Sequence, residues 1–338
     1  MANKNLNKAK EAKKDEFYTQ LEDINNELRH YREHFRGKTV LCNCDDPRVS
    51  NFFTYFAYNF EFLGLKKLIT TCYKNQDTDL FSTQQSKEAV YLIYEGDKNG
   101  DHIPNVEEIG VHPLKGDGDF RSAECIELLK EADIVVTNPP FSLFREYIAQ
   151  LIEYDKKFII VGNVNAVKYK EVFPLIMQNK VWLGASIHSG DRKFWVPDDY
   201  ELNAAGCGID ETGRKYIRVK GVRWFTNLDY KERHEDLILY KLYAPEEYPR
   251  YVNYDAIEVS RTEYIPCDYD GVMGVPITFI DKYNPDQFEI IGIGLELANM
   301  DIIRKRLGKL NGGPRLYLDK DGELVRLYER ILIRKIQR

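Results

Sequence analysis

Short apolar runs alternate with amphipathic segments through the first half of the chain. The apolar runs predict β-strands, and apolar positions three or four residues apart predict α-helices between them. The predicted strands lie at 39–44, 67–73, 90–94, 133–137, 157–161 and 181–183, and the predicted helices at 15–35, 50–62, 122–130, 143–154 and 169–178. Strands that alternate with helices in this way are typical of a parallel sheet with helices on both faces. The predicted fold class is therefore α/β, with a doubly wound sheet.

The pattern changes between residues 185 and 200. Downstream, the predicted strands are short, turns are frequent, and Tyr, Arg and Trp interleave within residues 214–225. Upstream, residues 1–14 are mainly Lys, Asn and Ala, a composition that favours a flexible leader. We therefore expect a leader at 1–14, a first domain at 15–195 and a mixed α+β region at 196–338 that could return strands to the first sheet.

The most informative stretch is 133-DIVVTNPPF-141, in which an apolar strand runs directly into two prolines. Each proline fixes φ and lacks an N–H donor, so the strand must end at this corner. Ligands bind at the carboxyl ends of strands in open α/β sheets. The side-chain oxygen of Asn138 and a neighbouring backbone carbonyl are both acceptors, and the ring of Phe141 can stack on a planar group. Together these residues predict a site for an amide, an aniline or the exocyclic amine of a nucleobase.

Three other predicted strand ends could cradle a second ligand at the same edge of the sheet. They lie in 40-VLCNCDDP-47, 68-LITTCYK-74 and 116-GDGDFRS-122. Carboxylates and a helix N-terminus in the first of these could surround a polar group. Asp-Asp-Pro and Gly-Asp-Gly-Asp are also ordinary turn sequences, so either segment alone favours a turn over a site. The chain contains neither GxGxxG nor GxxxxGK[ST], so nothing supports a dinucleotide-binding site or a P-loop.

Composition narrows the class of protein further. The 338 residues are 43% hydrophobic and 30% charged, with a formal net charge of −6. No apolar stretch is long enough for a membrane span, and the polar N-terminus lacks the pattern of a secretory signal. The cysteines form no CxxC pair and the histidines show no ligand spacing. We therefore expect reduced thiols, a cytoplasmic protein and no bound metal.

The Asn-Pro-Pro-Phe corner is similar to the catalytic motif of amino-methyltransferases that use S-adenosylmethionine. Within that group, the chain resembles the EcoRI-type adenine-N6 DNA methyltransferases. The stretches that carry this resemblance are 15-DEFYTQ-20, 42-CNCDDPRVSNFF-53, 116-GDGDFRS-122, 133-DIVVTNPPFSLF-144 and 271-GVMGVPITF-279. The resemblance implies a Rossmann-like methyltransferase sheet, a cofactor-binding catalytic domain at 15–195 and a target-recognition region at 196–338.

The resemblance also implies roles for individual residues. The catalytic motif is Asn138, Pro139, Pro140 and Phe141. The positions implied for binding S-adenosylmethionine are Phe17, Tyr18, Thr19, Cys44, Asp45, Asp46, Cys72, Tyr73, Asp119 and Phe120. Residues 44–46, Cys-Asp-Asp, differ from the Gly-rich sequence that the family usually has at this cofactor-binding motif. Phe194, with Trp195 beside it, lies where the family packs an aromatic ring on the target base.

Basic residues beyond position 196 are candidates for contacts to phosphate or guanine. They are Arg214, Lys215, Arg218, Lys220 and Arg223. A charged hairpin face explains any one of them at least as well. Residues 301–338 are also basic, with 11 Lys and Arg against 5 Asp and Glu, but a solvated final helix and strand would have the same composition.

The implied function is site-specific transfer of a methyl group from S-adenosylmethionine to N6 of an adenine that is flipped out of duplex DNA, in a restriction-modification system. Double-stranded DNA is the expected partner, and a cognate endonuclease would act on the same site without contacting this chain. A monomer with no membrane partner is expected. Methylation of an RNA base is the runner-up, because Asn-Pro-Pro-Phe also occurs in ribosomal RNA methyltransferases. Methylation of a protein glutamine is the third alternative, because a side-chain amide fits the same acceptors. The non-enzymatic alternative is a DNA-binding module with a degenerate cofactor site.

Overall fold

The computed structural model describes residues 17–44, 50–71, 89–101, 104–105, 108–196, 200–202, 206–308 and 313–337. The chain folds as two compact units, of which unit 1 comprises residues 1–176 with 180–230, and unit 2 comprises 177–179 with 231–338. The boundary between the two units falls after Tyr230, whereas the sequence predicts a functional boundary after residue 195. The functional assignment of residues 196–338 stays a prediction. Within the described part of the chain, no helix combines the length and the apolar character that crossing a membrane requires.

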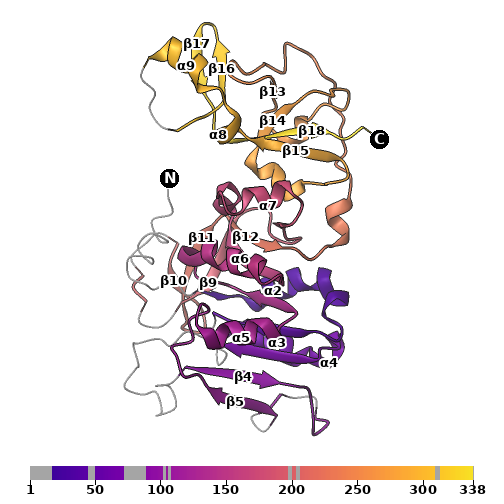
Figure 1. Ribbon diagram of the computed structural model, residues 1–338, viewed down its shortest axis with the longest axis vertical. Helices are drawn as coiled ribbons and strands as arrows, with labels where there is room; N and C mark the ends of the chain where they lie inside the picture. Colours follow the sequence, from indigo (N-terminus) through magenta and orange to yellow (C-terminus); the bar gives the residue numbers. More distant parts are fainter. Residues whose placement is uncertain are drawn as a thin grey trace. The chain divides into compact units, whose positions relative to one another are not determined.

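An eight-stranded sheet forms the centre of unit 1 (Figure 1). Its strand order is β5 (Ile109–Pro113), β4 (Val90–Tyr94), β3 (Lys67–Thr71), β2 (Thr39–Cys42), β6 (Ile134–Thr137), β7 (Lys157–Asn163), β12 (Val222–Thr226) and β8 (Trp182–Leu183). The four strands β3, β2, β6 and β7 are parallel, as the alternation of strands and helices predicts. The flanking strands β4, β5, β12 and β8 join antiparallel, so the sheet is mixed at both ends.

Helices cover both faces of this sheet, which confirms the doubly wound α/β fold. Trp224 and Phe225 are neighbours on β12, so their side chains point to opposite faces. Trp224 packs edge-on against Phe52 of α3 (Asn51–Tyr58), whereas Phe225 packs against Phe144 of α6 (Phe144–Glu153). The other helical segments in the described part of unit 1 are α2 (Leu21–Leu28), η1 (Arg29–Phe35), α4 (Phe60–Leu63), α5 (Ala123–Glu131), η3 (Phe141–Leu143), η4 (Val164–Lys168) and most of α7 (Phe173–Met177).

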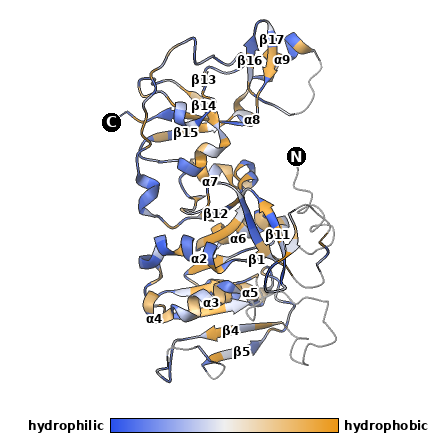
Figure 2. Ribbon diagram, turned by 180° about the vertical axis from the view of Figure 1, so that it is seen from behind, coloured by the Kyte–Doolittle hydropathy of each residue, from blue (hydrophilic) through white to orange (hydrophobic). Residues whose placement is uncertain are grey.

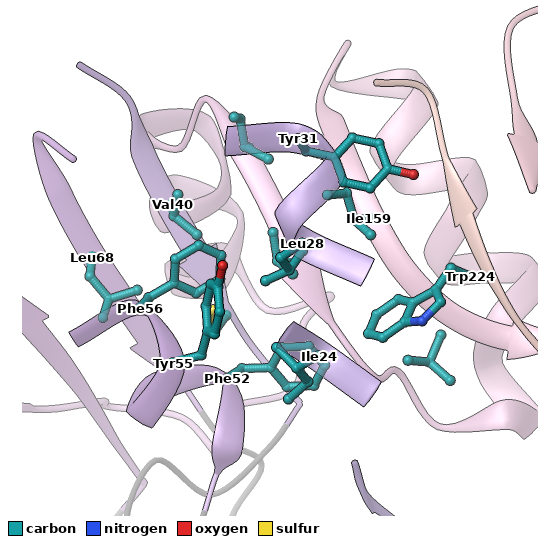
Figure 3. Close-up of a cluster of buried hydrophobic side chains, with 14 of the residues drawn as sticks. Ile24, Leu28, Tyr31, Val40, Phe52, Tyr55, Phe56, Leu68, Ile159 and Trp224 are labelled. Atoms are coloured by element: carbon teal, nitrogen blue, oxygen red, sulfur yellow. The ribbon is translucent and has the colours of Figure 1, made fainter. Parts of the chain in front are cut away.

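The main hydrophobic core lies between the sheet and the helices α2 and α3 (Figure 3). Ile24 and Leu28 of α2 meet Phe52 and Phe56 of α3, and all four side chains are fully buried. Strands β2, β3, β7 and β12 contribute Val40, Leu68, Ile159 and Trp224 to the same cluster. Many residues in the strands of the central sheet are hydrophobic, whereas many in the connecting segments are hydrophilic (Figure 2). Each fully buried side chain of this size contributes about 1.5–3 kcal/mol to folding, so this cluster fixes how the helices sit on the sheet.

The N-terminal segment differs from its prediction. The sequence predicts one helix over 15–35, but the structure has the short strand β1 (Tyr18–Thr19) followed by α2 and η1. β1 pairs antiparallel with β9 (Asp191–Trp195), at the edge of a second sheet of order β1-β9-β11-β10. The other two strands are β11 (Lys215–Lys220) and β10 (Gly208–Ile209). The spacing of apolar residues predicts a helix here because a local pattern carries no information about a partner strand about 175 residues away.

Unit 2 contains a four-stranded sheet and a β-hairpin. The sheet order is β13 (Ile257–Glu258), β14 (Met273–Pro276), β18 (Arg330–Lys335) and β15 (Phe288–Ile293), and the hairpin is β16 (Tyr317–Lys320) with β17 (Glu323–Arg326). Its helical segments are η5 (Lys231–His234), η6 (Thr262–Tyr264), η7 (Ile277–Lys282), α8 (Gly294–Leu297) and α9 (Met300–Leu307). The buried carboxylate of Glu258 accepts hydrogen bonds from Arg330 Nη2 at 2.7 Å and from the hydroxyl of Tyr251. This charged pair ties β13 to β18 within the sheet of unit 2.

Candidate active site

The Asn-Pro-Pro-Phe corner lies at the carboxyl end of β6, between β2 and β7. Asn138 is only 6% exposed, and Phe141 is half-buried at the start of η3. The Pro140 carbonyl accepts the N–H of Leu143 at 2.9 Å and so closes the turn into α6. Among the described residues, no hydrogen bond ends on the carbonyl of Pro139. The corner therefore presents a free acceptor at the position that the sequence predicts.

A single hydrogen bond fixes the orientation of the Asn138 amide. Its Nδ2 donates to the backbone carbonyl of Phe17 at 2.5 Å. A carbonyl oxygen can only accept, so this contact assigns the nitrogen to that side and directs Oδ1 to the other. Within the described part of the chain, Oδ1 has no hydrogen-bond partner. The side-chain oxygen and the Pro139 carbonyl are thus two acceptors that the described residues leave unused.

Four aromatic rings gather beside this corner. Phe17 is at their centre, with ring centroids 5.9 Å from Phe141, 6.1 Å from Phe194 and 6.3 Å from Tyr200. Phe141 and Phe194 are themselves 6.3 Å apart in an edge-on arrangement. Phe17 and Phe194 are almost fully buried, so Phe141 is the member of the three Phe rings that keeps an exposed surface. The apolar wall can therefore offer the ring of Phe141 to a planar ligand.

The strand β1 brings two of the predicted N-terminal residues to the site and turns the third away. Phe17 and Thr19 are buried, whereas Tyr18 lies on the opposite face of the strand and is half-buried. Among the residues that the structure describes, the Oγ1 of Thr19 has no hydrogen-bond partner, although Thr19 is only 3% exposed. A buried hydroxyl without a partner costs about 1–3 kcal/mol, so its presence here points to a ligand that would satisfy it.

The carboxyl end of β2 is fixed by residues that sequence analysis did not single out. The hydroxyl of Thr137 donates to the carbonyl of Asn43, and the hydroxyl of Tyr147 on α6 donates to the Asn43 side chain. Burial raises the pKa of Tyr147 well above its ordinary value, so the hydroxyl stays protonated and keeps donating. Cys44 follows with φ of 77°, a left-handed conformation that glycine adopts without strain. This conformation explains why a Gly-rich turn would also fit here.

Asp119 and Phe120 are placed next to the first turn of α5. Arg121 donates to both carboxylate oxygens of Asp119, at 2.9 Å and 2.6 Å, and also pairs with Glu146 of α6. The hydrogen bonds from the Arg121 side chain lower the pKa of Asp119. Phe120 is buried edge-on against Tyr147, with ring centroids 5.0 Å apart. Oδ1 also accepts the backbone N–H of Arg121 at 2.8 Å, so the carboxylate stays ionised and oriented, and Oδ2 is the oxygen that keeps capacity for a further donor.

Comparison with known proteins agrees with this geometry. The family model described as adenine-specific methyltransferase EcoRI matches residues 5–336. The chain is 56% identical over 291 residues to the Type II methyltransferase M.EcoRI of Escherichia coli, covering 86% of this chain and 89% of that protein. It is 37% identical to M.MgeORF184P of Mycoplasma genitalium, over 98% and 99% of the two chains, and 40% identical to M.MpnI of Mycoplasma pneumoniae, over 85% and 84%.

The chain belongs to the EcoRI family of adenine-specific methyltransferases. The resemblance that the sequence stretches carry is therefore confirmed, and the protein is an enzyme that methylates adenine. Four of the predicted cofactor positions in this EcoRI-family enzyme, Asp45, Asp46, Cys72 and Tyr73, lie outside the described residues. Roles of single residues stay predictions, which the geometry can support residue by residue.

The EcoRI-family enzyme separates its two predicted stacking residues. Phe194 points into the aromatic cluster around Phe17, whereas Trp195 follows it on β9 and faces the other side of the sheet. The indole Nε1 of Trp195 donates to Asp210 Oδ2 at 2.9 Å, and the guanidinium of Arg214 lies 4.7 Å above the indole ring. Hydrogen bonds from the Thr212 hydroxyl and from Trp195 lower the pKa of Asp210, so that carboxylate stays charged. Trp195 therefore supports Arg214 rather than the apolar wall.

The basic residues predicted to contact DNA fall into two groups. Arg214, Arg218 and Lys220 are exposed on the hairpin and outer face of β11. Lys215 donates to the carbonyl of Tyr200 at 3.1 Å, so it holds the aromatic cluster in place. Arg223 is only 4% exposed and donates to the carbonyls of Val222 and His188 at 2.8 Å and 2.5 Å. Because its guanidinium is buried and bonded, Arg223 has a structural role and is left out of the proposed DNA surface.

One group of described residues has the geometry of a metal site. The carboxylates of Asp97, Asp101 and Glu108 come within 4.8 Å of one another. Glu108 accepts backbone N–H groups of Lys98 and Asn99 at 2.8 Å and 3.2 Å, which accounts for its burial without an ion. The cluster precedes β5 and contains none of the residues assigned to the adenine site.

Proposed function

We propose that this enzyme transfers a methyl group from S-adenosylmethionine to the exocyclic N6 of an adenine in duplex DNA. The observation that carries the proposal is the orientation of the Asn138 amide, whose nitrogen is held by Phe17 while its oxygen faces away unpaired. Two acceptors at one corner suit a group with two hydrogens, and the exocyclic amine of adenine has two. The Type II methyltransferases that resemble the chain support DNA as the substrate.

The residues around the corner fit the cofactor by their chemistry. The unpaired buried hydroxyl of Thr19, the oriented carboxylate of Asp119 and the aromatic rings of Phe17 and Phe120 offer polar and apolar contacts for an adenosine and an amino-acid chain. These residues, with Cys44 at the end of β2, would hold the cofactor. When bound, the cofactor supplies an electrophilic methyl group on a sulfonium.

Asn138 and Pro139 supply the two acceptors that prepare the adenine amine for methyl transfer. The Asn138 Oδ1 and the Pro139 carbonyl accept the two N6 hydrogens, which favours a tetrahedral nitrogen with an available lone pair. No acid or base of shifted pKa is needed, since the proton can leave after the transfer. The rate enhancement then comes from holding the nitrogen in line with the methyl group and from these preorganised dipoles.

An adenine inside a duplex hides its N6 from these acceptors, so it must rotate out of the stack. Unstacking costs a few kcal/mol, and stacking on an aromatic ring contributes about 1–3 kcal/mol per base. Phe141 is placed for this role because its ring is half-exposed beside Asn138. Phe194 packs against the rings of Phe17 and Phe141 and so supports the position of the Phe141 ring.

The substrate assignment is tested by competition among three acceptors. Labelled S-adenosylmethionine is incubated with the enzyme and unmethylated duplex DNA, structured RNA or a glutamine-containing protein, and labelled nucleosides are identified after digestion. The proposal expects label in N6-methyladenine from DNA alone. Label in RNA or in protein instead would make one of those substrates the correct one. Absence of cofactor binding and of label in all three would leave the DNA-binding module.

Arg218 and Lys220 are expected to contact the phosphate backbone. Both side chains are exposed on β11, at alternate positions of the same face. Replacing both with alanine should weaken binding to every duplex similarly and reduce the slope of log affinity against log salt by about one per lost contact. The measurement is a salt titration of duplex binding by fluorescence anisotropy. Lys130→Ala, at the end of α5 that leads into the amino end of β6, is the control and should leave the slope unchanged.

The remaining partners follow from this activity. We infer a monomer, because each strand of a site can be methylated in a separate encounter. A cognate endonuclease would recognise the same DNA site without contacting this chain. DNA as substrate also places the enzyme in the cytoplasm, where the described cysteines, all of them free thiols, would stay reduced.

A further inference from the structure

We propose that Asn51 is a positioning residue, which sets the orientation of the Asn138 amide through the strand that joins them. The inference rests on the proposed function, because Asn138 is the residue that would receive the adenine amine. Asn51 does not contact Asn138. The two asparagines bind the same short segment, Phe17–Thr19, at carbonyls two residues apart.

The first contact comes from the start of α3. Asn51 Nδ2 donates to the carbonyl of Thr19 at 2.6 Å. Asn51 is the first residue of the helix, and the buried Ser50 before it caps the helix by accepting the N–H groups of Phe52 and Phe53. A capped helix start with a buried N-cap has little freedom. The Asn51 amide is therefore a fixed donor rather than a mobile side chain.

The second contact comes from the corner after β6, where Asn138 Nδ2 donates to the carbonyl of Phe17. Carbonyls two residues apart in an extended strand point to the same edge. β1 is the edge strand of its sheet and pairs with β9 on its other side through Tyr18 and Thr19 only. The two asparagine amides thus occupy the edge of β1 at which the described part of the chain provides no partner strand, and each satisfies one carbonyl there.

This arrangement makes the orientation of Asn138 depend on Asn51. A strand of two paired residues holds its own position weakly, so the Thr19 carbonyl needs the Asn51 donor to keep the Phe17 carbonyl in place. If the Phe17 carbonyl shifts, the Asn138 amide loses the contact that directs Oδ1 to the substrate. Small displacements of a positioning group slow a reaction by up to about a hundredfold.

Asn51→Asp is the variant of choice. It keeps the size of the side chain and favours the first turn of a helix, so α3 keeps its stability, but a carboxylate cannot donate to the Thr19 carbonyl. Asn51→Ala is the second variant, which removes the donor without adding charge. The matched control is Asn59→Ala at the other end of α3, where the side-chain amide donates to the carbonyl of Tyr55 at 2.8 Å.

The test is a double-mutant cycle with Asn138→Ala, measured as single-turnover methyl transfer at saturating DNA and cofactor. We expect both Asn51 variants to slow transfer about ten- to a hundredfold with melting temperatures near that of the wild type, and Asn59→Ala to react normally. In the Asn138→Ala background, Asn51→Asp should cause no further loss, because no amide remains to be oriented.

Two results would overturn the inference while the wild type remains active. One is a normal rate for both Asn51 variants, and the other is the same loss from Asn51→Asp with and without Asn138. A wild-type enzyme that transfers no methyl to DNA would instead overturn the proposed function itself.

Discussion

Replacing Asn138 with alanine is expected to lower the rate constant for methyl transfer by about a hundredfold or more, while the cofactor still binds. The side chain supplies one of the two acceptors at the corner, and removal of one preorganised polar group from an active site costs about 10²–10³ in rate. The substitution also leaves the Phe17 carbonyl without its donor, which destabilises the fold by about 1–3 kcal/mol. The expected loss of rate therefore exceeds what partial unfolding would cause.

Transfer of labelled methyl to duplex DNA under single-turnover conditions measures this effect, with cofactor affinity and melting temperature determined on the same preparation. Asn25→Ala, an exposed substitution on α2, serves as the matched control and should retain the wild-type rate. A rate within tenfold of the wild type, in a folded protein that binds the cofactor, would remove Asn138 from the mechanism. A loss of cofactor binding would assign Asn138 to the cofactor site instead.

Replacing Glu27 with alanine is expected to destabilise unit 1 by about 3–5 kcal/mol, because each buried donor that loses its acceptor costs about 1–3 kcal/mol. The Glu27 carboxylate is fully buried and accepts four hydrogen bonds. The donors are the backbone N–H groups of Ala185 and Ser186, both at 2.8 Å, the Ser186 hydroxyl at 2.5 Å and the Tyr31 hydroxyl at 2.8 Å. Alanine would take this acceptor away from all four donors, of which the Tyr31 hydroxyl is buried and those of Ala185 and Ser186 are half-buried.

Tryptophan fluorescence during urea unfolding isolates this effect, because the three tryptophans of the chain, at 182, 195 and 224, all lie in unit 1. Glu22→Ala, on the exposed side of the same helix, is the control and should shift the midpoint little. Gly184→Ala probes the same contact from the other side, since its Cβ would lie 2.1 Å from Glu27 Oε1 and must displace it. A Glu27→Ala midpoint equal to that of Glu22→Ala would contradict the expected role.

The local pattern of the sequence was sufficient for the central sheet and its corner. The four parallel strands β3, β2, β6 and β7 appear where apolar runs predict them, because a strand buried on both faces must be apolar throughout. The end of β6 at Asn138 also follows from local chemistry, since two prolines cannot continue a strand in any tertiary context. The same proline pair exposes a carbonyl, which is why the corner proposed as catalytic is visible in the sequence.

The partners of that corner depend on contacts between distant parts of the chain. β1 forms because β9 and Asn51 are available to it, although its own residues continue a helical pattern. Arg223 resembles its exposed basic neighbours in sequence, but the insertion of β12 between β7 and β8 buries it. Side-chain direction and burial follow from which surfaces meet, and a local pattern carries no information about the surface that arrives from elsewhere.

The sequence by itself therefore determined the α/β class, the order of the central helices and strands, and the chemistry of residues 138–141. The tertiary structure alone decided which carbonyl accepts the hydrogen bond from the side-chain nitrogen of Asn138. It also decided how Phe17 packs in the aromatic cluster and which basic residues remain exposed. The physical reason is that periodicity and proline act within a few residues. The Asn138–Phe17 hydrogen bond, the pairing of β1 with β9 and the packing around Phe17 join segments about 120 to 180 residues apart, and the Asn51–Thr19 hydrogen bond spans 32 residues.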